Sequence, residues 1–320
     1  MPDRPRGSRA LVLLAFASIW FVWGSTFLVI RYAIDGIPPF LMCGMRLFSA
    51  GLVLLVWARL RGDAWPRGRE WVNASLVGIL LPGVGNTAVT LGVAHLPSGL
   101  VALLVASIPL WMGLLSALGP TAEPPGRQAL LGLSLGFAGI ALLIGPGLFG
   151  SHQDRFEPLW TLVPIAGSLS WAWGSLWSRR AQQPRSPLVS TGVGLTAAGL
   201  VLLVLSATRG ELAGWSPAAV PARAWISTGY LSVFGSVLAF TGYLYLLARV
   251  EPAKVATYAF VNPIVAMALG LVFAGETLSG RTLLAAAIVL AAVWLITTAR
   301  AATRGAGVPT GAGAVPARRA

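Results

Sequence analysis

Residues 11–30 read LVLLAFASIWFVWGSTFLVI and contain no charged side chain. An apolar run of this length crosses the roughly 30 Å hydrocarbon core of a bilayer as one helix, and it is too long for the core of a cleaved signal peptide. The tripeptide Trp23-Gly24-Ser25 inside this run returns as Trp173-Gly174-Ser175 inside another apolar run. We therefore interpret the chain as a membrane protein that crosses the bilayer several times and consists of two related halves.

The composition supports lipid as the solvent of this chain. Hydrophobic residues make up 56% of the 320 residues and charged residues only 10%, whereas soluble domains carry about a quarter charged residues. A net charge of +13 on a soluble protein would suggest a nucleic-acid partner. Here the basic residues fall beside apolar runs, where they act as topology signals. The predicted partners are thus the lipid bilayer and a small-molecule substrate, and no nucleic acid.

Ten apolar segments are long enough to be predicted membrane spans. Their approximate limits are 11–31, 39–58, 71–94, 98–119, 128–148, 159–178, 187–208, 224–247, 253–274 and 282–299. Prolines at Pro38-Pro39, Pro97 and Pro124-Pro125 suit the first turns of helices, where a missing N–H costs little. The predicted fold class is an all-α membrane protein with ten transmembrane helices.

The basic residues also predict the orientation of the chain. With the N-terminus in the cytoplasm, most Arg and Lys residues fall on the cytoplasmic side, as the positive-inside rule requires. We expect a multi-pass protein of the cell (inner) membrane, with a cytoplasmic N-terminus over residues 1–10. Residues 301–320 contain Gly, Ala, Pro and Arg without apolar periodicity, which predicts a disordered basic cytoplasmic tail.

The two halves are predicted to be inverted repeats, residues 11–148 (helices 1–5) and residues 159–299 (helices 6–10). Each half has an odd number of spans, so the second half enters the membrane from the opposite side. Pro97 has a counterpart in Pro252, and Glu123 roughly matches Glu276. Trp23 lies about 18 Å into its span and Trp173 about 20 Å into its own, at 1.5 Å per residue, from opposite faces.

Pro109 and Pro263 form a matched pair near the middle of the bilayer. A proline inside a helix removes a hydrogen bond, and corresponding interruptions in two repeats point to a transporter's binding site. We predict that both act as kinks or gates. The alternative is that they are ordinary membrane-helix prolines, which neighbouring helices tolerate.

Arg46 is a charged residue inside a predicted span, about 10 Å below the outer surface. A guanidinium at this depth is costly, so it should face the bundle interior with a partner. The corresponding region of the second half, near Gly194, has no arginine, which suggests that Arg46 binds a substrate carboxylate. The alternatives are snorkelling to the interface or a structural pair with Asp35 or Glu276.

Other polar and aromatic side chains at depth are further candidates for substrate contacts. Asn86, its mirror position Thr241, and Asn262 can contact a ligand or bond carbonyls freed by a proline. Trp23, Trp111 and Trp173 lie too deep for the interfacial belts, and deep indoles can stack on an aromatic or cationic solute. Lipid-facing or helix-packing roles are the alternative for these three indoles.

Five stretches together carry a resemblance to a known family. The chain resembles the ten-helix EamA-type carriers of the drug/metabolite transporter superfamily, and most closely the YedA-type inner-membrane exporters. The stretches are IWFVWGSTFLVIRYAI, PPFLMCGMRLFSAG, GNTAVTLGVAHLPSGLVALLVASIPLW, GSLSWAWGSLWSRR and YLYLLARVEPAKVATYAFVNPIVAMALGLVFAGETLS. The resemblance implies two EamA repeats, a central cavity and alternating access. Members of the family carry amino acids, other metabolites or drugs, so it implies no particular substrate.

Several chemistries lack the residues that they need. The single cysteine, Cys43, and the distant His95 and His152 predict no metal site, and no cofactor is expected. No nucleotide-binding Walker motif is present, so this chain alone should not be driven by ATP. We predict a secondary transporter, acting as a monomer, that exports small metabolites (amino acids or related solutes) or drug-like solutes. The alternatives are a membrane-embedded enzyme and a non-transporting receptor or assembly factor.

Overall fold

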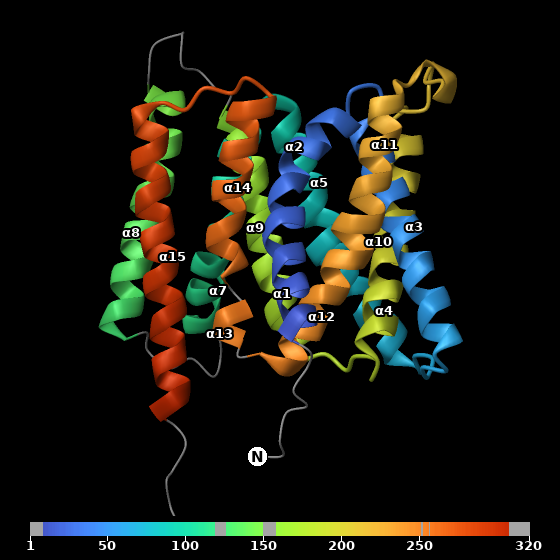
Figure 1. The fold of residues 1–320 in the computed structure, drawn as a ribbon, viewed down its shortest axis with the longest axis horizontal. Helices are drawn as coiled ribbons and strands as arrows, with labels where there is room; N and C mark the ends of the chain where they lie inside the picture. Colours follow the sequence, from blue (N-terminus) through green and yellow to red (C-terminus); the bar gives the residue numbers. More distant parts are fainter. Residues whose placement is uncertain (1–8, 119–125, 150–157, 251, 256, 307–320) are drawn as a thin grey trace, which may run out of the picture.

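The computed structural model describes residues 9–118, 126–149, 158–250, 252–255 and 257–306. Every regular element in these ranges is helical, and they contain no strand. The long helices stand side by side in a bundle, with α1 starting and α15 ending at the same end (Figure 1). The predicted cytoplasmic N-terminus lies almost entirely outside the described residues.

Seven helical segments are long and apolar enough to cross a membrane by length and composition. They are Arg9–Ala33, Pro39–Leu60, Arg69–His95, Ser98–Ala117, Pro187–Thr208, Ala222–Tyr243 and Gly280–Thr298. Two shorter apolar helices are Arg127–Leu143 and Tyr258–Phe273. The all-helical membrane fold is therefore confirmed, while ten spans remain a prediction.

Proline and serine begin two of the long helices. Helix α3 (Pro39–Leu60) has Pro38 as its N-cap, and α10 (Pro187–Thr208) has Ser186 as its N-cap. The Ser186 hydroxyl accepts a hydrogen bond from the Val189 N–H at 3.4 Å. Proline at the first helical position loses no helical hydrogen bond and already has the helical φ, which explains why these starts are readable in the sequence.

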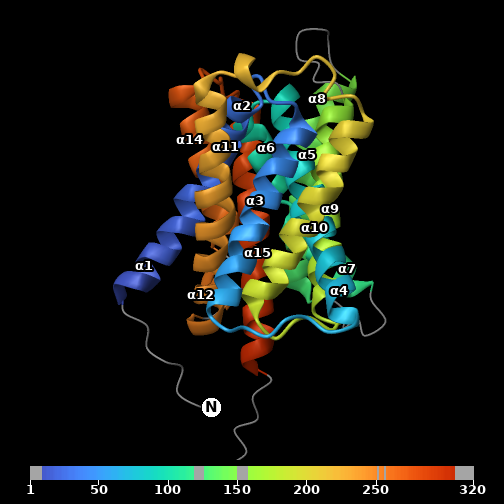
Figure 2. The same ribbon diagram turned by 90° about the vertical axis from the view of Figure 1, so that its right-hand side faces the viewer.

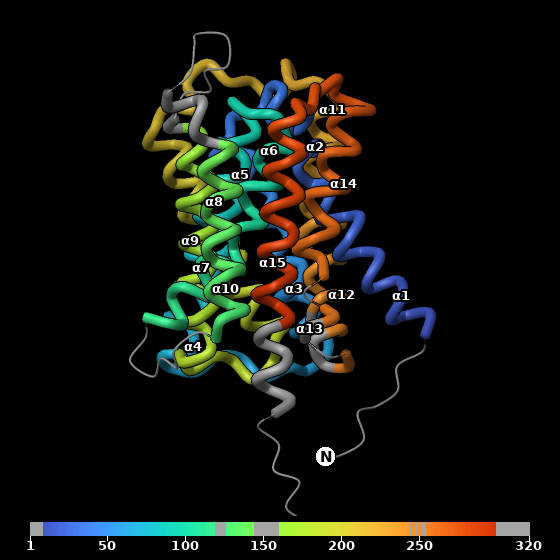
Figure 3. The backbone as a smooth tube through the Cα atoms, turned by 90° about the vertical axis from the view of Figure 1, so that its left-hand side faces the viewer, coloured from blue at the N-terminus to red at the C-terminus, as the bar shows by residue number. Residues whose placement is uncertain are grey.

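Helices α3 and α10 pack antiparallel along their length, on the right of the bundle in Figure 1. Gly44 lies against Leu203, and Gly51 lies against Thr196, so residue numbers rise along one helix as they fall along the other. Helices α8 (Arg127–Phe149) and α15 (Gly280–Ala306) form a second antiparallel pair, which Figure 3 shows from the side. Glycine lets these backbones approach closely, as is typical of membrane helix pairs.

The first segment consists of α1 (Arg9–Ala17), η1 (Ser18–Val22) and α2 (Trp23–Ala33). It packs antiparallel to a later segment of α11 (Ala222–Tyr230), η4 (Leu231–Leu238) and α12 (Ala239–Arg249). The hydroxyls of Ser25 and Tyr230 lie 2.9 Å apart, and Gly242 lies against Ser18. Figure 2 shows α1, α11 and α12 along the same side of the bundle.

The third segment consists of α4 (Arg69–Gly78), η2 (Ile79–Val84) and α5 (Gly85–His95), and it packs antiparallel to α9 (Pro158–Ser178). Gly85 lies against Trp171, and Gly92 lies against Pro164. The elements η1, η2 and η4 are π-helical turns inside otherwise α-helical segments. Such turns occur frequently at functional sites, and Pro82 within η2 is one local cause.

Two further segments are interrupted. Helix α6 (Ser98–Val105) is followed by α7 (Ile108–Ala117), and helix α13 (Pro252–Val255) is followed by α14 (Tyr258–Phe273). Pro109 comes directly after the first interruption, at the start of α7, whereas Pro263 lies inside α14. Counted from the matched Pro97 and Pro252, the two prolines lie 12 and 11 residues on, whereas α7 begins 11 residues after Pro97 and α14 only 6 residues after Pro252. The two prolines thus correspond more closely than the two interruptions do.

The end of the chain differs from the prediction in one respect. Helix α15 continues to Ala306, beyond the predicted limit at residue 299. The tail predicted to be disordered therefore begins with helical residues, because Ala and Arg at its start are good helix formers. The remainder of that predicted tail, residues 307–320, lies outside the described residues.

Candidate functional site

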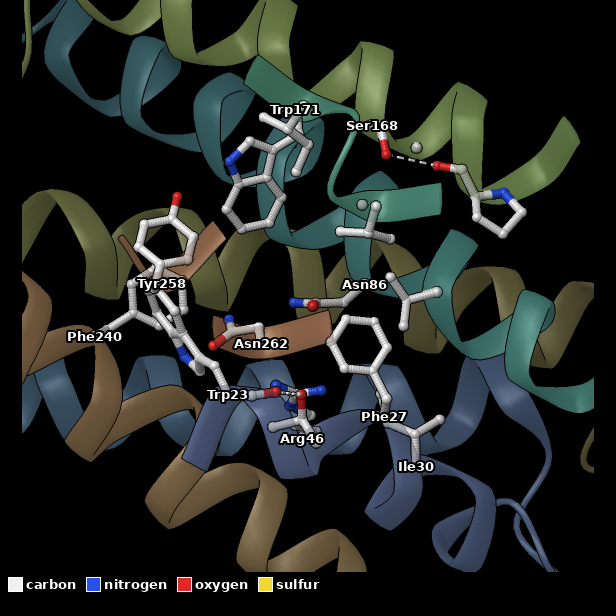
Figure 4. A pocket seen from close by; sticks show the side chains of 17 residues that line it. Trp23, Phe27, Ile30, Arg46, Asn86, Ser168, Trp171, Phe240, Tyr258 and Asn262 are labelled. Atoms are coloured by element: carbon white, nitrogen blue, oxygen red, sulfur yellow. Dashed lines mark hydrogen bonds between the residues drawn. The ribbon is translucent and has the colours of Figure 1, made fainter. Parts of the chain in front are cut away.

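A cavity of about 110 Å³ lies in the middle of the bundle. A buried water needs only about 10–15 Å³ by this kind of measure, so the cavity has room for a small solute or several waters. Helices from both halves of the chain line it (Figure 4). The lining residues are Trp23, Thr26, Phe27, Ile30, Arg46, Gly85, Asn86, Val89, Val105, Ile108, Pro164, Gly167, Ser168, Trp171, Phe240, Tyr258 and Asn262.

Aromatic side chains close the cavity toward the end of the bundle where the chain starts. The Trp23 ring contacts Phe240, Tyr243 and Tyr258, with ring centroids 5.2–5.6 Å apart. The Trp23 indole N–H also donates to the Gly235 carbonyl at 3.0 Å. The tilted and edge-on geometries are those that aromatic pairs prefer, so this wall is well packed.

A second pocket lies further along α2 and α5. Trp171 packs on Gly85, and Ile30 and Val89 lie about one helical turn before that pocket. The second pocket lies at the C-terminal ends of α2 and α5, and charged residues contribute to it. Its lining residues are Arg31, Tyr32, Ile34, Asp35, Pro39, Val93, Ala94 and Arg223.

The amides of Asn86 and Asn262 face one another across the cavity in Figure 4. Asn262 sits next to Pro263 and close to the π-helical turn η1. With its nitrogen turned toward η1, the Asn262 amide donates to the carbonyls of Ile19 and Trp20 at 3.0 and 3.1 Å. Asn262 therefore lines the cavity and also donates to backbone carbonyls of η1, while its contact with a ligand stays a prediction.

Arg46 reaches the cavity from α3 and is only 3% exposed. Its Nε donates to the Ser236 hydroxyl at 3.1 Å, while one terminal nitrogen, Nη1, is buried without a hydrogen-bond partner. The structure excludes the two structural ion pairs considered from the sequence. Asp35 pairs with Arg223 at 2.7 Å, and Glu276 pairs with Arg31 at 3.1 Å.

Four of the predicted contact residues lie together in the cavity: Trp23, Arg46, Asn86 and Asn262. Trp111, Trp173 and Thr241 are not among its lining residues, and in this the structure differs from the prediction. The Trp111 indole donates to Ser107 and its ring packs on Phe137, while the Thr241 hydroxyl donates to its own helix at Val237. Trp173 is 56% exposed on the bundle surface, which favours the lipid-facing role that was the alternative for this indole.

Neither predicted kink proline lines the cavity, but each lies beside residues that do. Ile108 precedes Pro109, and Asn262 precedes Pro263. Both helix interruptions also reach the cavity, through Val105 and Ile108 in one half and Tyr258 in the other.

Sequence reasoning missed Trp171, Tyr258, Phe240 and Ser168 as cavity residues. Trp171 lies two positions before Trp173, on a different face of α9. Trp173 matches Trp23 in the repeated tripeptide. The tryptophan of α9 that lines the cavity together with Trp23 is Trp171. Two residues turn a helix by about 200°, so the sequence puts the two tryptophans on different faces of α9, but it does not show which face meets the cavity.

Comparisons with known proteins agree with this architecture. The sequence pattern of the EamA-like transporter family matches twice, over residues 10–145 and 158–298. The inner membrane transporter YedA of Escherichia coli (strain K12) is 36% identical over 285 residues, which cover 88% of this chain and 89% of that protein. A probable amino-acid metabolite efflux pump of Salmonella typhimurium is 27% identical over 290 residues, covering 86% and 90% of the two chains.

The fold also matches a solved structure. A crystal structure with 21% sequence identity superimposes with a TM-score of 0.58 and covers 92% of this chain and 100% of the other. At this level of identity the match supports the fold alone.

Proposed function

Since the chain belongs to the EamA-like transporter family, and is thus a transporter rather than an enzyme, we propose that it is a secondary carrier that exports small metabolites by alternating access. The cavity between the two halves is the observation that carries this proposal. The residues that precede the matched Pro109 and Pro263 line it, and proline interruptions in corresponding positions of two halves mark transporter binding sites.

The proposal includes ten membrane helices in two inverted repeats, and the capping of two helices supports it. Glu211, after α10, accepts hydrogen bonds from the N–H groups of Phe40 and Leu41 at the start of α3, at 3.2 and 2.9 Å. Asp63, after α3, accepts one from the N-cap Ser186 of α10 at 2.7 Å. Each acid thus stabilises the helix start of the other half, as a two-fold axis between α3 and α10 requires.

The cavity walls have the same approximate symmetry. The Trp23 indole N–H donates to the Gly235 carbonyl of one π-helical turn, and the Trp171 ring lies against Gly85, directly after another. Pro109 and Pro263 occupy corresponding places in their halves, 12 and 11 residues after the matched Pro97 and Pro252. The separate family matches to each half agree with this reading.

The orientation and the oligomeric state are also part of the proposal. The start of α1 and the end of α15 lie at the same end of the bundle in Figure 1. Together with the basic residues near that end, this supports cytoplasmic termini. One chain encloses the cavity, so the carrier is proposed to act as a monomer.

Within the cavity, Trp23, Arg46, Asn86 and Asn262 are proposed to contact the substrate. Aromatic walls with a few polar groups are typical of sites for small organic molecules. The Salmonella relative is named for amino-acid metabolite efflux, so amino acids and the organic acids related to them are the first compounds to test.

Flux measurements with purified protein in liposomes test the carrier function. We expect saturable uptake or exchange of at least one solute from a panel of amino acids, organic acids and cationic drugs. Protein-free liposomes are the control. Absence of flux for the whole panel, from protein that is folded by thermal unfolding, would count against a carrier.

Cysteine labelling tests alternating access. Single cysteines at positions 86, 109 and 263 in a Cys43→Ala background should change their reactivity when substrate is added or when its gradient is reversed. Constant reactivity at all three positions, in protein that transports, would contradict alternating access through this cavity.

A further inference from the structure

Arg46 brings a positive charge into the cavity without a negative partner. In the described part of the chain it forms no ion pair, and none of the residues that line the cavity is acidic. Its Nη1 is buried without a partner, although its Nε is held by Ser236. A buried guanidinium with an unused N–H is costly in a low dielectric.

The nearby acids are already engaged elsewhere. Glu276 pairs with Arg31, and its carboxylate also accepts hydrogen bonds from the Ser98 N–H at 2.7 Å and the Gly99 N–H at 3.2 Å. Asp35 pairs with Arg223, and Glu211 caps α3. The missing counter-charge must therefore come from outside the described residues, and a molecule in the cavity is placed to supply it.

We infer that the cavity selects solutes with a single carboxylate and an apolar body, in preference to zwitterionic amino acids and to cations; this inference rests on the proposed function. The planar guanidinium of arginine matches the geometry of a carboxylate. One positive charge balances one negative charge, so a dianion would leave a buried charge uncompensated. An ammonium group would find aromatic rings and neutral amides, but no carboxylate, among the lining residues.

The rest of the wall fits the apolar body of such a solute. Trp23, Phe27 and Trp171 present ring faces and edges, and Ile30 and Val89 present aliphatic surface. Asn86 and Ser168 are neutral groups that can hydrogen-bond a carboxylate or a hydroxyl without adding charge.

A matched series of phenyl compounds tests this selection on the purified full-length protein in detergent. The probes are 3-phenylpropionate, phenylalanine, 2-phenylethylamine and 3-phenylpropan-1-ol, which share a ring and differ in charge. A ligand that binds only the folded protein raises the melting temperature. We expect 3-phenylpropionate to raise it, and the other three to raise it much less at the same concentration.

Variants locate the effect at Arg46. Arg46→Gln should weaken 3-phenylpropionate binding about ten- to hundredfold, the usual range for losing a hydrogen bond to a charged group. Arg46→Lys should retain part of the binding, because the charge stays and only the planar geometry is lost. Arg223→Gln, which removes an exposed arginine outside the cavity, is the matched control and should leave the binding unchanged.

Each contrary outcome has a defined meaning. Equal stabilisation by the amine, the alcohol or phenylalanine, or no stabilisation by 3-phenylpropionate, would overturn the selection for carboxylates. Undiminished binding of 3-phenylpropionate by Arg46→Gln would overturn the role of Arg46. If that variant does not fold, the phenyl series on the wild-type protein tests the selection for carboxylates, and Arg46→Lys tests the role of Arg46.

Liposome flux separates this inference from the proposed function. Flux of amino acids or cations without flux of monocarboxylates would support the carrier function and contradict the selection for monocarboxylates. Binding of 3-phenylpropionate without flux of any solute would instead retain the selection and count against the carrier.

Discussion

Arg46 and Ser236 show how one hydrogen bond can hold a functional side chain in place. The Ser236 hydroxyl is fully buried and accepts the Arg46 Nε–H at 3.1 Å, across the contact between α3 and η4. This bond holds the guanidinium by its Nε and leaves Nη1 without a hydrogen-bond partner. A positioning role for Ser236 follows, because it touches the arginine and not the cavity itself.

Ser236→Ala should therefore weaken ligand binding through Arg46 by about tenfold, since a hydrogen bond to a charged group contributes about 1.5–3 kcal/mol. The measurement is the dissociation constant of the best carboxylate found in the phenyl series. Ser232→Ala, one turn earlier on η4, is the control and should bind normally, because Ser232 bonds Thr228 and Ser49 instead. Equal effects of the two variants would argue for a general disturbance of η4.

At the scale of the helices, small residues decide how closely segments approach. Gly78 at the end of α4 lies directly on Gly194 of α10, and a Cβ on Gly78 would overlap the backbone of Gly194. This contact brings the third segment against α10 and thereby places Asn86, further along the same segment, at the cavity. A van der Waals contact of this kind is a main source of helix association in lipid.

Gly78→Ala should lower the free energy of unfolding by at least about 1–3 kcal/mol, the usual cost of overpacking. Gly229→Ala in α11 is the matched control, because a Cβ there meets no neighbour. That control should be neutral or stabilising by up to about 1 kcal/mol, since alanine favours helix over glycine. Thermal unfolding of both variants in detergent gives the comparison, and equal stabilities would contradict the close approach of α4 and α10.

Glu276 connects three helices at the end of the bundle where α2 ends. Its carboxylate accepts the N–H groups at the start of α6 and pairs with Arg31 of α2. Glu276 is almost fully buried, whereas the Asp35–Arg223 pair is more than half exposed on both sides. Buried, multiply bonded carboxylates contribute more to stability than exposed ion pairs.

Glu276→Gln should accordingly destabilise the protein by about 1–3 kcal/mol through weaker hydrogen bonds and loss of the ion pair. Asp35→Asn should change the unfolding temperature little, because exposed pairs contribute about 0–1 kcal/mol. Thermal unfolding at low and high salt distinguishes the two. A larger loss for Asp35→Asn than for Glu276→Gln would reverse the roles assigned to the two acids.

At the scale of the whole molecule, the inverted repeat makes a prediction about sides. Ala64 follows α3 and Leu212 follows α10, and both are exposed in loops at corresponding places in the two halves. If the halves are inverted, these loops lie on opposite faces of the membrane.

In a Cys43→Ala background, Leu212→Cys should react with a membrane-impermeant maleimide in intact cells, and Ala64→Cys only after permeabilisation. The Cys43→Ala protein without a new cysteine is the control and should stay unlabelled. Labelling of both positions from the same side would contradict the inverted arrangement.

The physical limits of sequence reasoning appear in particular residues. Chain-local signals, such as Pro38-Pro39 before α3 and Pro97 before α6, predicted helix starts well, because a missing N–H acts within one turn. The burial of Arg46 was predictable because a charge in lipid must face inward. The choice of Trp171 over Trp173 was not predictable in this way, since it depends on which face of α9 meets α5.

The amino-acid sequence alone determined that this chain is an all-helical membrane protein, because long uncharged runs are local properties of the chain. Its resemblance to the EamA type was also readable from the sequence, and the family matches confirmed it. Only the tertiary structure decided which side chains share the cavity, that Arg46 bonds Ser236 rather than an acid, and that Glu276 holds Arg31. Contacts between segments far apart in the chain depend on the rotation and depth of each helix. Neither quantity can be read from one segment of the sequence, because both depend on the neighbouring helices.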